Sequence, residues 1–170
     1  MKLIHSDKIA YNLNFKRLVL GYFTGHSFFA VLLYRRASFY ARHGIKLLPN
    51  MVKYTAMRKF GCEISPYATI GEGFRINHSV GIVIGHQVIA GKNLELFQNV
   101  TIGSNRKVKD GREMPIIGDN VSIYTGACVV GAIRIGNNVT IGANTYVDFD
   151  VPDNSIVHGT KGKIVLSGKL

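Results

Sequence analysis

The chain has 170 residues, of which 46% are hydrophobic and 18% charged, so it can hold one core in one or two small domains and is not a disordered protein. Its net charge of +11 is concentrated at one end. Residues 1–60 carry eleven Lys and Arg and a single acid, Asp7, whereas residues 61–170 carry ten basic and nine acidic residues. The first sixty residues also hold eleven of the seventeen aromatics. We therefore divide the chain into a basic, aromatic N-terminal region (1–60) and a nearly neutral remainder (61–170).

The N-terminal region is predicted to be helical. One helix is expected to run from Thr24 or Ser27 to Arg42-His43 and stop at Gly44. A second is expected to run from Asn50 to Lys59 and stop at Gly61, because basic last turns and a following glycine are typical of helix C-termini. Their apolar faces are expected to cap the first repeat of the structure that follows. A basic segment rich in aromatics and leucine also suits peripheral contact with an anionic membrane, so both interpretations stay open.

The basic charge does not by itself indicate a nucleic-acid partner, because no recognised nucleic-acid-binding module is present. The most apolar window, Leu18–Tyr34, has 17 residues and includes polar ones, whereas a membrane span needs about 20 apolar residues. The chain does not start with a signal-peptide pattern, and Cys62 and Cys128 lack metal-ligand spacing. The expected location is the cytoplasm, with the inner face of the membrane as the alternative.

A repeat of six residues organises the region 61–170. Counting in sixes, with one interruption, reaches a branched aliphatic residue at thirteen positions: Ile64, Ile70, Ile76, Ile82, Val88, Leu94, Val100, Ile117, Ile123, Val129, Ile135, Ile141 and Val147. Glycine and asparagine recur just after these positions, and they supply backbone conformations that other residues resist. Each six therefore predicts a short strand followed by a tight turn.

Strands this short cannot bury a core alone, so the repeats must stack as coils. Three hexads per coil predict a triangular prism of about 18 residues per turn, the left-handed parallel β-helix of hexapeptide repeats. In this register Ile64, Ile82 and Val100 form one stacked column, and four to five coils span residues 62–151. The predicted fold class is therefore mainly β, with a small helical N-terminal region.

The register breaks once, where residues 104–116 must leave the wall of the prism as an extruded loop. Four basic residues lie in it: Arg106, Lys107, Lys109 and Arg112. A long surface insertion costs little free energy, so the loop has a purely structural interpretation. We favour the other interpretation, a flap over a site at the edge of the prism, because functional residues concentrate on loops held by rigid scaffolds.

Four segments of the repeat carry a resemblance to a known family: EISPYATIG (63–71), INHSVGIVIG (76–85), QNVTIG (98–103) and IGDNV (117–121). They resemble the hexapeptide-repeat acyltransferases, in particular the serine O-acetyltransferase branch and its relatives in capsule and colanic-acid synthesis. The resemblance covers residues 61–165 well and extends weakly through Leu33–Phe39. It implies an O-acetyltransferase that uses acetyl-CoA as co-substrate without a metal, and a homotrimer with sites between neighbouring prisms.

The resemblance implies a role for His78 as the general base that takes the proton of an acceptor hydroxyl. A neutral imidazole suits that role near neutral pH. Glu63 stands where the family places a carboxylate that orients this ring, although its side chain is one methylene longer. A lone histidine in a β-rich core is as often structural, so a non-catalytic β-solenoid scaffold remains an alternative.

Two departures from the serine O-acetyltransferases lie at the predicted acceptor site. Asn77 replaces an acid that would pair with an ammonium group, and Met114 replaces a histidine just before the proline that closes the loop. With Arg112, these residues are the predicted substrate-binding set. They predict a glycan acceptor, a sugar hydroxyl of a capsular or extracellular polysaccharide or its precursor, with serine as the alternative acceptor.

The resemblance also implies where acetyl-CoA binds, with its pantetheine arm along an edge of the prism. The candidate positions are Gly103, Ser104, Gly126, Ala127, Gly142 and Ala143, where small side chains would let the arm approach, and Lys163, which would meet a CoA phosphate. The histidines other than His78 lack metal-ligand spacing, so no metal site is predicted.

Overall fold

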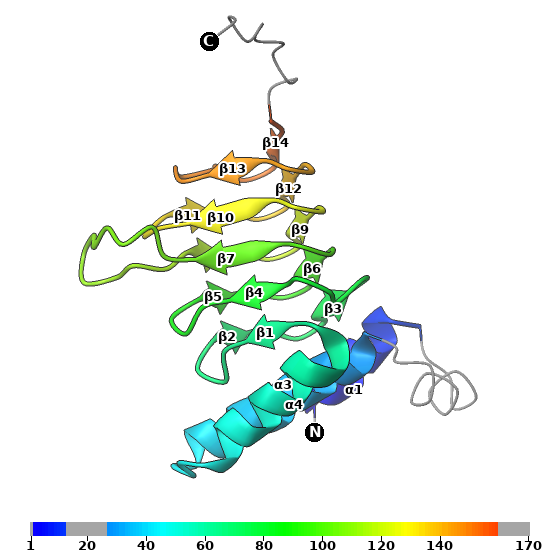
Figure 1. Cartoon of the computed structure of the whole chain (residues 1–170). Helices are drawn as coiled ribbons and strands as arrows, with labels where there is room; N and C mark the ends of the chain where they lie inside the picture. The colour runs from blue at the N-terminus through cyan, green and yellow to red at the C-terminus, as the bar shows by residue number, and fades with distance from the viewer. Residues whose placement is uncertain (1, 13–26, 160–170) are drawn as a thin grey trace, which may run out of the picture.

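The computed structural model describes residues 2–12 and 27–159, and Figure 1 shows helices lying across one end of a column of short strands. The described helices are α1 (Lys2–Ala10), α3 (Phe28–Arg42) and α4 (Leu48–Phe60). Helix α4 ends at Gly61, whose φ of 65° is left-handed, so the predicted glycine stop is confirmed. The other predicted helix is confirmed from Ser27 onward, and Thr24 lies outside the described residues.

The strands stack into three parallel sheets that form the walls of a prism (Figure 1). The first sheet contains β1 (Glu63–Ile64), β4 (Val83–Ile84), β7 (Thr101–Gly103), β10 (Cys128–Val130) and β13 (Tyr146–Val147). The second contains β2 (Thr69–Ile70), β5 (Ile89–Ala90), β8 (Ile116–Ile117) and β11 (Arg134–Ile135). The third contains β3 (Arg75–Ile76), β6 (Glu95–Leu96), β9 (Ser122–Ile123), β12 (Thr140–Ile141) and β14 (Ile156–Val157). The fold is a left-handed parallel β-helix, which confirms the predicted fold class.

The stacking register differs from the predicted one by two residues. Ile64 pairs with Ile84, and Ile84 with Ile102, so Ile82 and Val100 do not belong to this column. Both are nevertheless fully buried. Each hexad buries two side chains, one on its strand and one two residues before it. The count in sixes began on the strand position at Ile64 and moved to the earlier position at Ile82.

The cause is a wider corner in the first coil. Eight positions separate Ile76 on β3 from Ile84 on β4, whereas six separate Leu96 on β6 from Ile102 on β7. The two additional residues fall in the connection 77–82, which carries His78.

Neighbouring coils lie close together at several glycines, and Gly118 is one of them. A Cβ atom there would lie 2.8 Å from both the carbonyl carbon and the oxygen of Gly136 in the next coil. We predict that Gly118→Ala lowers the free energy of unfolding by about 1–3 kcal/mol, because the two coils must separate. Thermal melting measures the loss, with Gly103→Ala as the control, since a Cβ there meets only Thr101 Cγ2 at 4.0 Å. Equal melting temperatures for the two variants would contradict the packing described.

Two tyrosines, Tyr34 of α3 and Tyr11 just after α1, contact the first coil at the end of the prism. The Tyr34 hydroxyl donates to the Ala68 carbonyl at 2.9 Å. The Tyr11 hydroxyl donates to the Ile76 carbonyl at 2.9 Å and accepts the Ile76 N–H at 2.6 Å. Burial raises the pKa of both tyrosines above the ordinary value, so both hydroxyls stay protonated. The Ala68 carbonyl and both backbone groups of Ile76 thereby find partners without another strand.

A buried ion pair completes this cap. Arg35 donates to Asp7 through Nε at 2.8 Å and through Nη2 at 3.0 Å. The same guanidinium donates to the carbonyls of Ile70 and Gly71, and Asp7 accepts the Phe74 N–H at 2.9 Å. Both side chains are almost entirely buried. The helices thus join the first coil through charged hydrogen bonds as well as apolar packing.

Candidate functional site

His78 lies on the edge of the prism where the third sheet connects to the first, and we call this edge the His78 edge. Its connections are residues 77–82, 97–100, 124–127 and 142–145. The first two connections, 77–82 and 97–100, are joined by a backbone hydrogen bond in which Asn99 N–H donates to the Val80 carbonyl at 2.9 Å. The His78 edge therefore begins at the wide corner that holds His78 and continues through the later coils toward the C-terminus.

The His78 side chain is exposed on this corner. Glu63 lies beside the same corner, since its N–H donates to the Ile82 carbonyl at 2.8 Å. Its carboxylate accepts a hydrogen bond from Lys53 Nζ of α4 at 3.0 Å. Among the described residues, the hydrogen bonds found do not join Glu63 to His78. The structure brings the two residues to one corner, and the catalytic pair between them stays a prediction.

Asn77, which precedes His78, is tied to a carboxylate that the sequence analysis missed. Asn77 Nδ2 donates to Glu95 Oε1 at 2.8 Å, one coil further along the prism. Arg75 Nε lies 3.6 Å from the same oxygen, and the Ser122 hydroxyl donates to Glu95 Oε2 at 3.3 Å. The corner therefore keeps an anionic group although position 77 is not an acid. The strand pairing of β3 with β6, which places Glu95 beside Arg75, is what brings it there.

Four of the predicted acetyl-CoA positions lie on the His78 edge above His78: Gly126, Ala127, Gly142 and Ala143. Ala143 is exposed, whereas the Ala127 side chain is fully buried in the core, so Ala127 offers only its backbone. Gly126 has a φ of 69°, and a Cβ there would lie 2.2 Å from Asn144 Oδ1, so the turn itself requires glycine. Lys163 lies outside the described residues. Among the described residues, no three His, Cys, Asp or Glu side chains are grouped so that they could hold a metal ion.

Gly103 and Ser104 lie on a different edge, where the first sheet connects to the second. The extruded loop leaves the prism there, between β7 and β8, and the Ser104 hydroxyl donates to Glu113 Oε2 across its base at 3.1 Å. A cleft of about 310 Å³ lies between the loop and the coils above it. Lys107 and Lys109 line one side and Asp148, Phe149 and Asp150 the other. The sequence analysis did not identify this acidic side, because the two segments are far apart in the chain.

Met114 and Arg112, both predicted to bind substrate, have different environments. Met114 is buried, and its Sδ occupies the space next to Gly85, where a Cβ would lie only 2.8 Å away. Met114 is thus a core residue that fixes the end of the loop. Arg112 Nη1 is buried and has no hydrogen-bond partner among the described residues. Gln98 Oε1, on the His78 edge, is also buried without a partner in that part of the chain.

Unpaired buried polar atoms cost free energy, so those in native structures call for an explanation. Arg112 Nη1 is a cationic donor on the loop, and an anionic ligand or a neighbouring chain would satisfy it. The structure therefore presents an unused donor, an exposed imidazole and a carboxylate beside Asn77. The imidazole and the carboxylate share the His78 edge, whereas Arg112 lies on the loop at another edge of the prism.

The chain is similar to a transferase family model and to serine acetyltransferases. Residues 114–148 match the family model described as bacterial transferase hexapeptide (six repeats). The chain is 39% identical over 137 residues to the serine acetyltransferase of Bacillus pumilus, covering 81% of this chain and 63% of the relative. It is 44% identical over 126 residues to that of Staphylococcus aureus, covering 69% and 59% respectively. The crystal structure of Neisseria gonorrhoeae serine acetyltransferase superposes with a TM-score of 0.81 at 33% identity, covering 99% of this chain and 66% of that one. This chain thus spans about three fifths of the length of the curated relatives it matches.

The comparisons overturn one prediction. The glycan acceptor predicted from Asn77 and Met114 is wrong, since these relatives are serine acetyltransferases rather than enzymes that modify a polysaccharide. The physical reason lies in the neighbours of the two residues. Glu95 retains a carboxylate at the Asn77 corner, and Arg112 retains an unpaired donor two residues before Met114. The change at position 77 therefore leaves a carboxylate at that corner, and the change at position 114 leaves a cationic side chain nearby on the loop.

Proposed function

The chain belongs to the hexapeptide-repeat acyltransferases, and from this premise we propose that it transfers the acetyl group of acetyl-CoA to the hydroxyl of serine. The observation that carries the proposal is the exposed His78 on the widened corner between β3 and β4, in a chain 39–44% identical to serine acetyltransferases. The charges beside that corner support an amino-acid acceptor.

The proposed reaction is a direct transfer. The serine hydroxyl oxygen attacks the carbonyl carbon of the thioester, and His78 takes the hydroxyl proton as the new C–O bond forms. The tetrahedral intermediate then loses the thiolate of CoA as the C–S bond breaks, and the imidazolium returns the proton to that sulfur. We propose that Glu63 leaves Lys53 and holds the imidazolium when substrates bind. Backbone N–H groups at the edge would stabilise the developing oxyanion.

The acceptor would be held by its two charged groups. Glu95, with Asn77, would meet the ammonium group, and Arg112 would meet the carboxylate through its unpaired Nη1. The loop leaves the prism at a different edge from the one that carries His78. We therefore propose a homotrimer in which the loop of one subunit reaches the His78 edge of the next, so that each site is complete only in the assembly.

We predict that Arg112→Gln raises the KM for serine by about 10–100-fold, because a charge-assisted hydrogen bond is lost, with a smaller effect on kcat. Steady-state kinetics with L-serine at saturating acetyl-CoA measures both constants. Arg106→Gln is the matched control, since it removes the same charge from an exposed position of the same loop. An unchanged KM in Arg112→Gln would show that Arg112 does not bind the acceptor.

The acceptor is tested by the release of CoA thiol from acetyl-CoA with one acceptor at a time. L-serine should support turnover, and L-alanine, which lacks the hydroxyl, should not. Thiol release with oligosaccharides and none with L-serine would overturn the proposal. The absence of release with every acceptor would favour the non-catalytic scaffold.

A further inference from the structure

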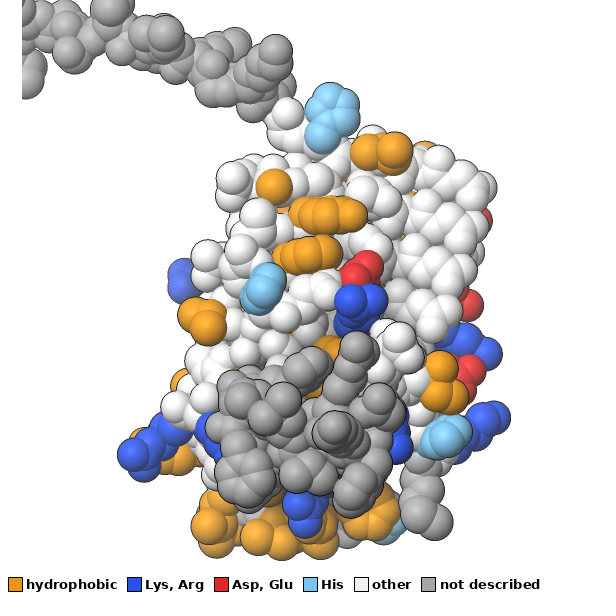
Figure 2. Space-filling model, turned by 90° about the vertical axis from the view of Figure 1, so that its right-hand side faces the viewer, with side chains coloured by type: hydrophobic (Ala, Val, Ile, Leu, Met, Phe, Trp, Pro, Cys, Tyr) orange, Lys and Arg blue, Asp and Glu red, His pale blue; other side chains and the backbone are white. Residues whose placement is uncertain are grey.

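The helices that cap the prism leave a second, outward surface, which we call the base face. Its apolar members are Phe39 of α3, Leu47 just before α4, and Met51 and Tyr54 of α4, which are 56%, 70%, 53% and 58% exposed. Its basic members are Arg36, Arg42, Lys46 and Arg58, all exposed. Figure 2 shows hydrophobic side chains gathered with Lys and Arg at the helical end of the molecule, below the prism, which carries side chains of both charges.

On α4 the base face is a regular stripe. Leu47, Met51, Tyr54 and Arg58 follow one another at spacings of four, three and four residues, so they share one side of the helix. The buried residues Pro49, Ala56 and Phe60 lie on the opposite side. The Arg58 guanidinium carbon lies 5.8 Å from the centre of the Tyr54 ring, so cation and aromatic are combined within the stripe. Helix α4 is thus amphipathic in two directions, with an apolar side toward the prism and another toward solvent.

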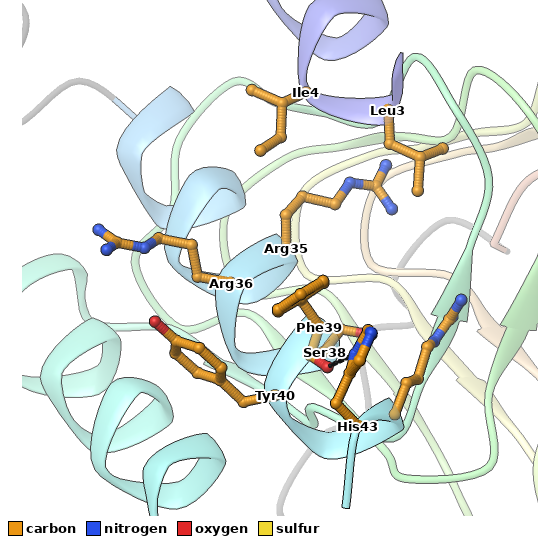
Figure 3. Close-up of a pocket in the computed structure, with 9 residues that line it drawn as sticks. Leu3, Ile4, Arg35, Arg36, Ser38, Phe39, Tyr40 and His43 are labelled. Atoms are coloured by element: carbon orange, nitrogen blue, oxygen red, sulfur yellow. Dashed lines mark hydrogen bonds between the residues drawn. The ribbon is translucent and has the colours of Figure 1, made fainter. Parts of the chain in front are cut away.

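A pocket between α1 and α3 is also lined by apolar and basic side chains (Figure 3). It has a volume of about 300 Å³, and Leu3 and Ile4 of α1 lie across it from Phe39. The ring centres of Phe39 and His43 are 4.0 Å apart. Arg36 and Arg42 also line the pocket, so an apolar cavity lies beside guanidinium groups.

The charge of the base face identifies its partner. The sequence has no Asp or Glu between positions 8 and 62, and Asp7 is buried against Arg35. Two copies of the chain meeting through this face would place cations against cations, which opposes self-association. An anionic surface complements it, and the exposed apolar side chains require a surface that can also accept them.

We propose that the base face docks on the surface of an anionic phospholipid bilayer. The apolar side chains would enter the boundary between headgroups and acyl chains, and the surrounding Arg and Lys would meet the lipid phosphates. The proposed contact is peripheral. None of the helices within the described residues is long and apolar enough to span a bilayer. This inference does not depend on the acceptor proposed above. It would hold the prism and its acetyl-transfer site beside the membrane.

The test is flotation of the full-length protein with vesicles of phosphatidylcholine alone or with 30 mol % phosphatidylglycerol, a fraction chosen as roughly that of an anionic membrane surface. We expect binding to the anionic vesicles only, weakening as salt is raised from about 0.1 M to 0.5 M. The variant Arg42→Gln/Lys46→Gln/Arg58→Gln should bind about a hundredfold more weakly, since each cation near an anionic surface contributes about fivefold. The variant Leu47→Ser/Met51→Ser/Tyr54→Ser should also lose binding.

The matched control is Arg106→Gln/Lys107→Gln/Lys109→Gln, which removes the same charge from the loop on the prism, and it should bind vesicles within about twofold of the wild type. Circular dichroism and thiol release from acetyl-CoA verify that the base-face variants remain folded. Vesicle binding that is equal in the base-face and loop variants would overturn the proposal. So would a wild-type protein that ignores anionic vesicles while the Leu47→Ser/Met51→Ser/Tyr54→Ser variant sediments as a smaller oligomer, because the face would then be covered by a second copy.

Discussion

Replacing His78 by alanine is expected to lower the rate of acetyl transfer to L-serine by about 10²–10⁴-fold, because the acceptor hydroxyl loses its general base. The thermal unfolding midpoint should stay close to that of the wild type. The side chain is exposed, so its removal leaves no cavity in the core. Thiol release from acetyl-CoA measures the rate, and differential scanning calorimetry verifies the fold.

His86→Ala is the matched control for this prediction. His86 is also exposed on a corner of the prism, but on the connection from the first sheet to the second. It should retain wild-type turnover. If His78→Ala were as active as His86→Ala, the assignment of His78 as the base would be refuted, whatever the acceptor.

Removing the Arg35 side chain is expected to destabilise the fold by about 3–5 kcal/mol, because Arg35→Ala leaves the Asp7 carboxylate buried and unpaired. The carbonyls of Ile70 and Gly71 lose their donor as well. Asp7→Asn should be destabilising for the complementary reason, since it leaves the guanidinium charge uncompensated. Urea unfolding followed by circular dichroism measures both losses.

The control for the buried pair is an exposed one. Lys92 Nζ and Glu72 Oε1 are also 3.0 Å apart, but the Lys92 side chain is 60% exposed and that of Glu72 28%, so solvent screens their attraction. Lys92→Ala should therefore leave the urea midpoint almost unchanged. A midpoint for Arg35→Ala that matched that of Lys92→Ala would mean that the helices are not held to the first coil by this pair.

The fold was predictable because its physical rule is local. A short strand with one or two inward aliphatic residues can be buried only by stacking, so the period of six determines the architecture. The column of Ile64, Ile82 and Val100 was not predictable in the same way. The hexad contains two buried positions, so a count in sixes cannot detect an insertion of two residues that moves it from one to the other. That insertion widens the corner of His78, so the error and the candidate site fall in the same place.

The candidate site was only partly predictable for a related reason. The sequence identified His78 and brought Glu63 to the same corner, but it did not predict that Lys53 of α4 would pair with that carboxylate. It also missed Glu95. This residue lies beside Asn77 because β3 pairs with β6, so that Arg75 stands opposite Glu95, 20 residues later. The acceptor was predicted from positions 77 and 114 alone, without the residues of neighbouring coils that contact them. Interactions between coils decide the charge of the site.

The central claim is acetyl transfer to serine at the His78 edge, and the most direct measurement is mass spectrometry of the products formed from acetyl-CoA and L-serine by the purified protein. We predict O-acetylserine and free CoA in equal amounts, with both lost in His78→Ala and retained in His86→Ala. CoA released without O-acetylserine, or O-acetylserine formed equally well by His78→Ala, would contradict it.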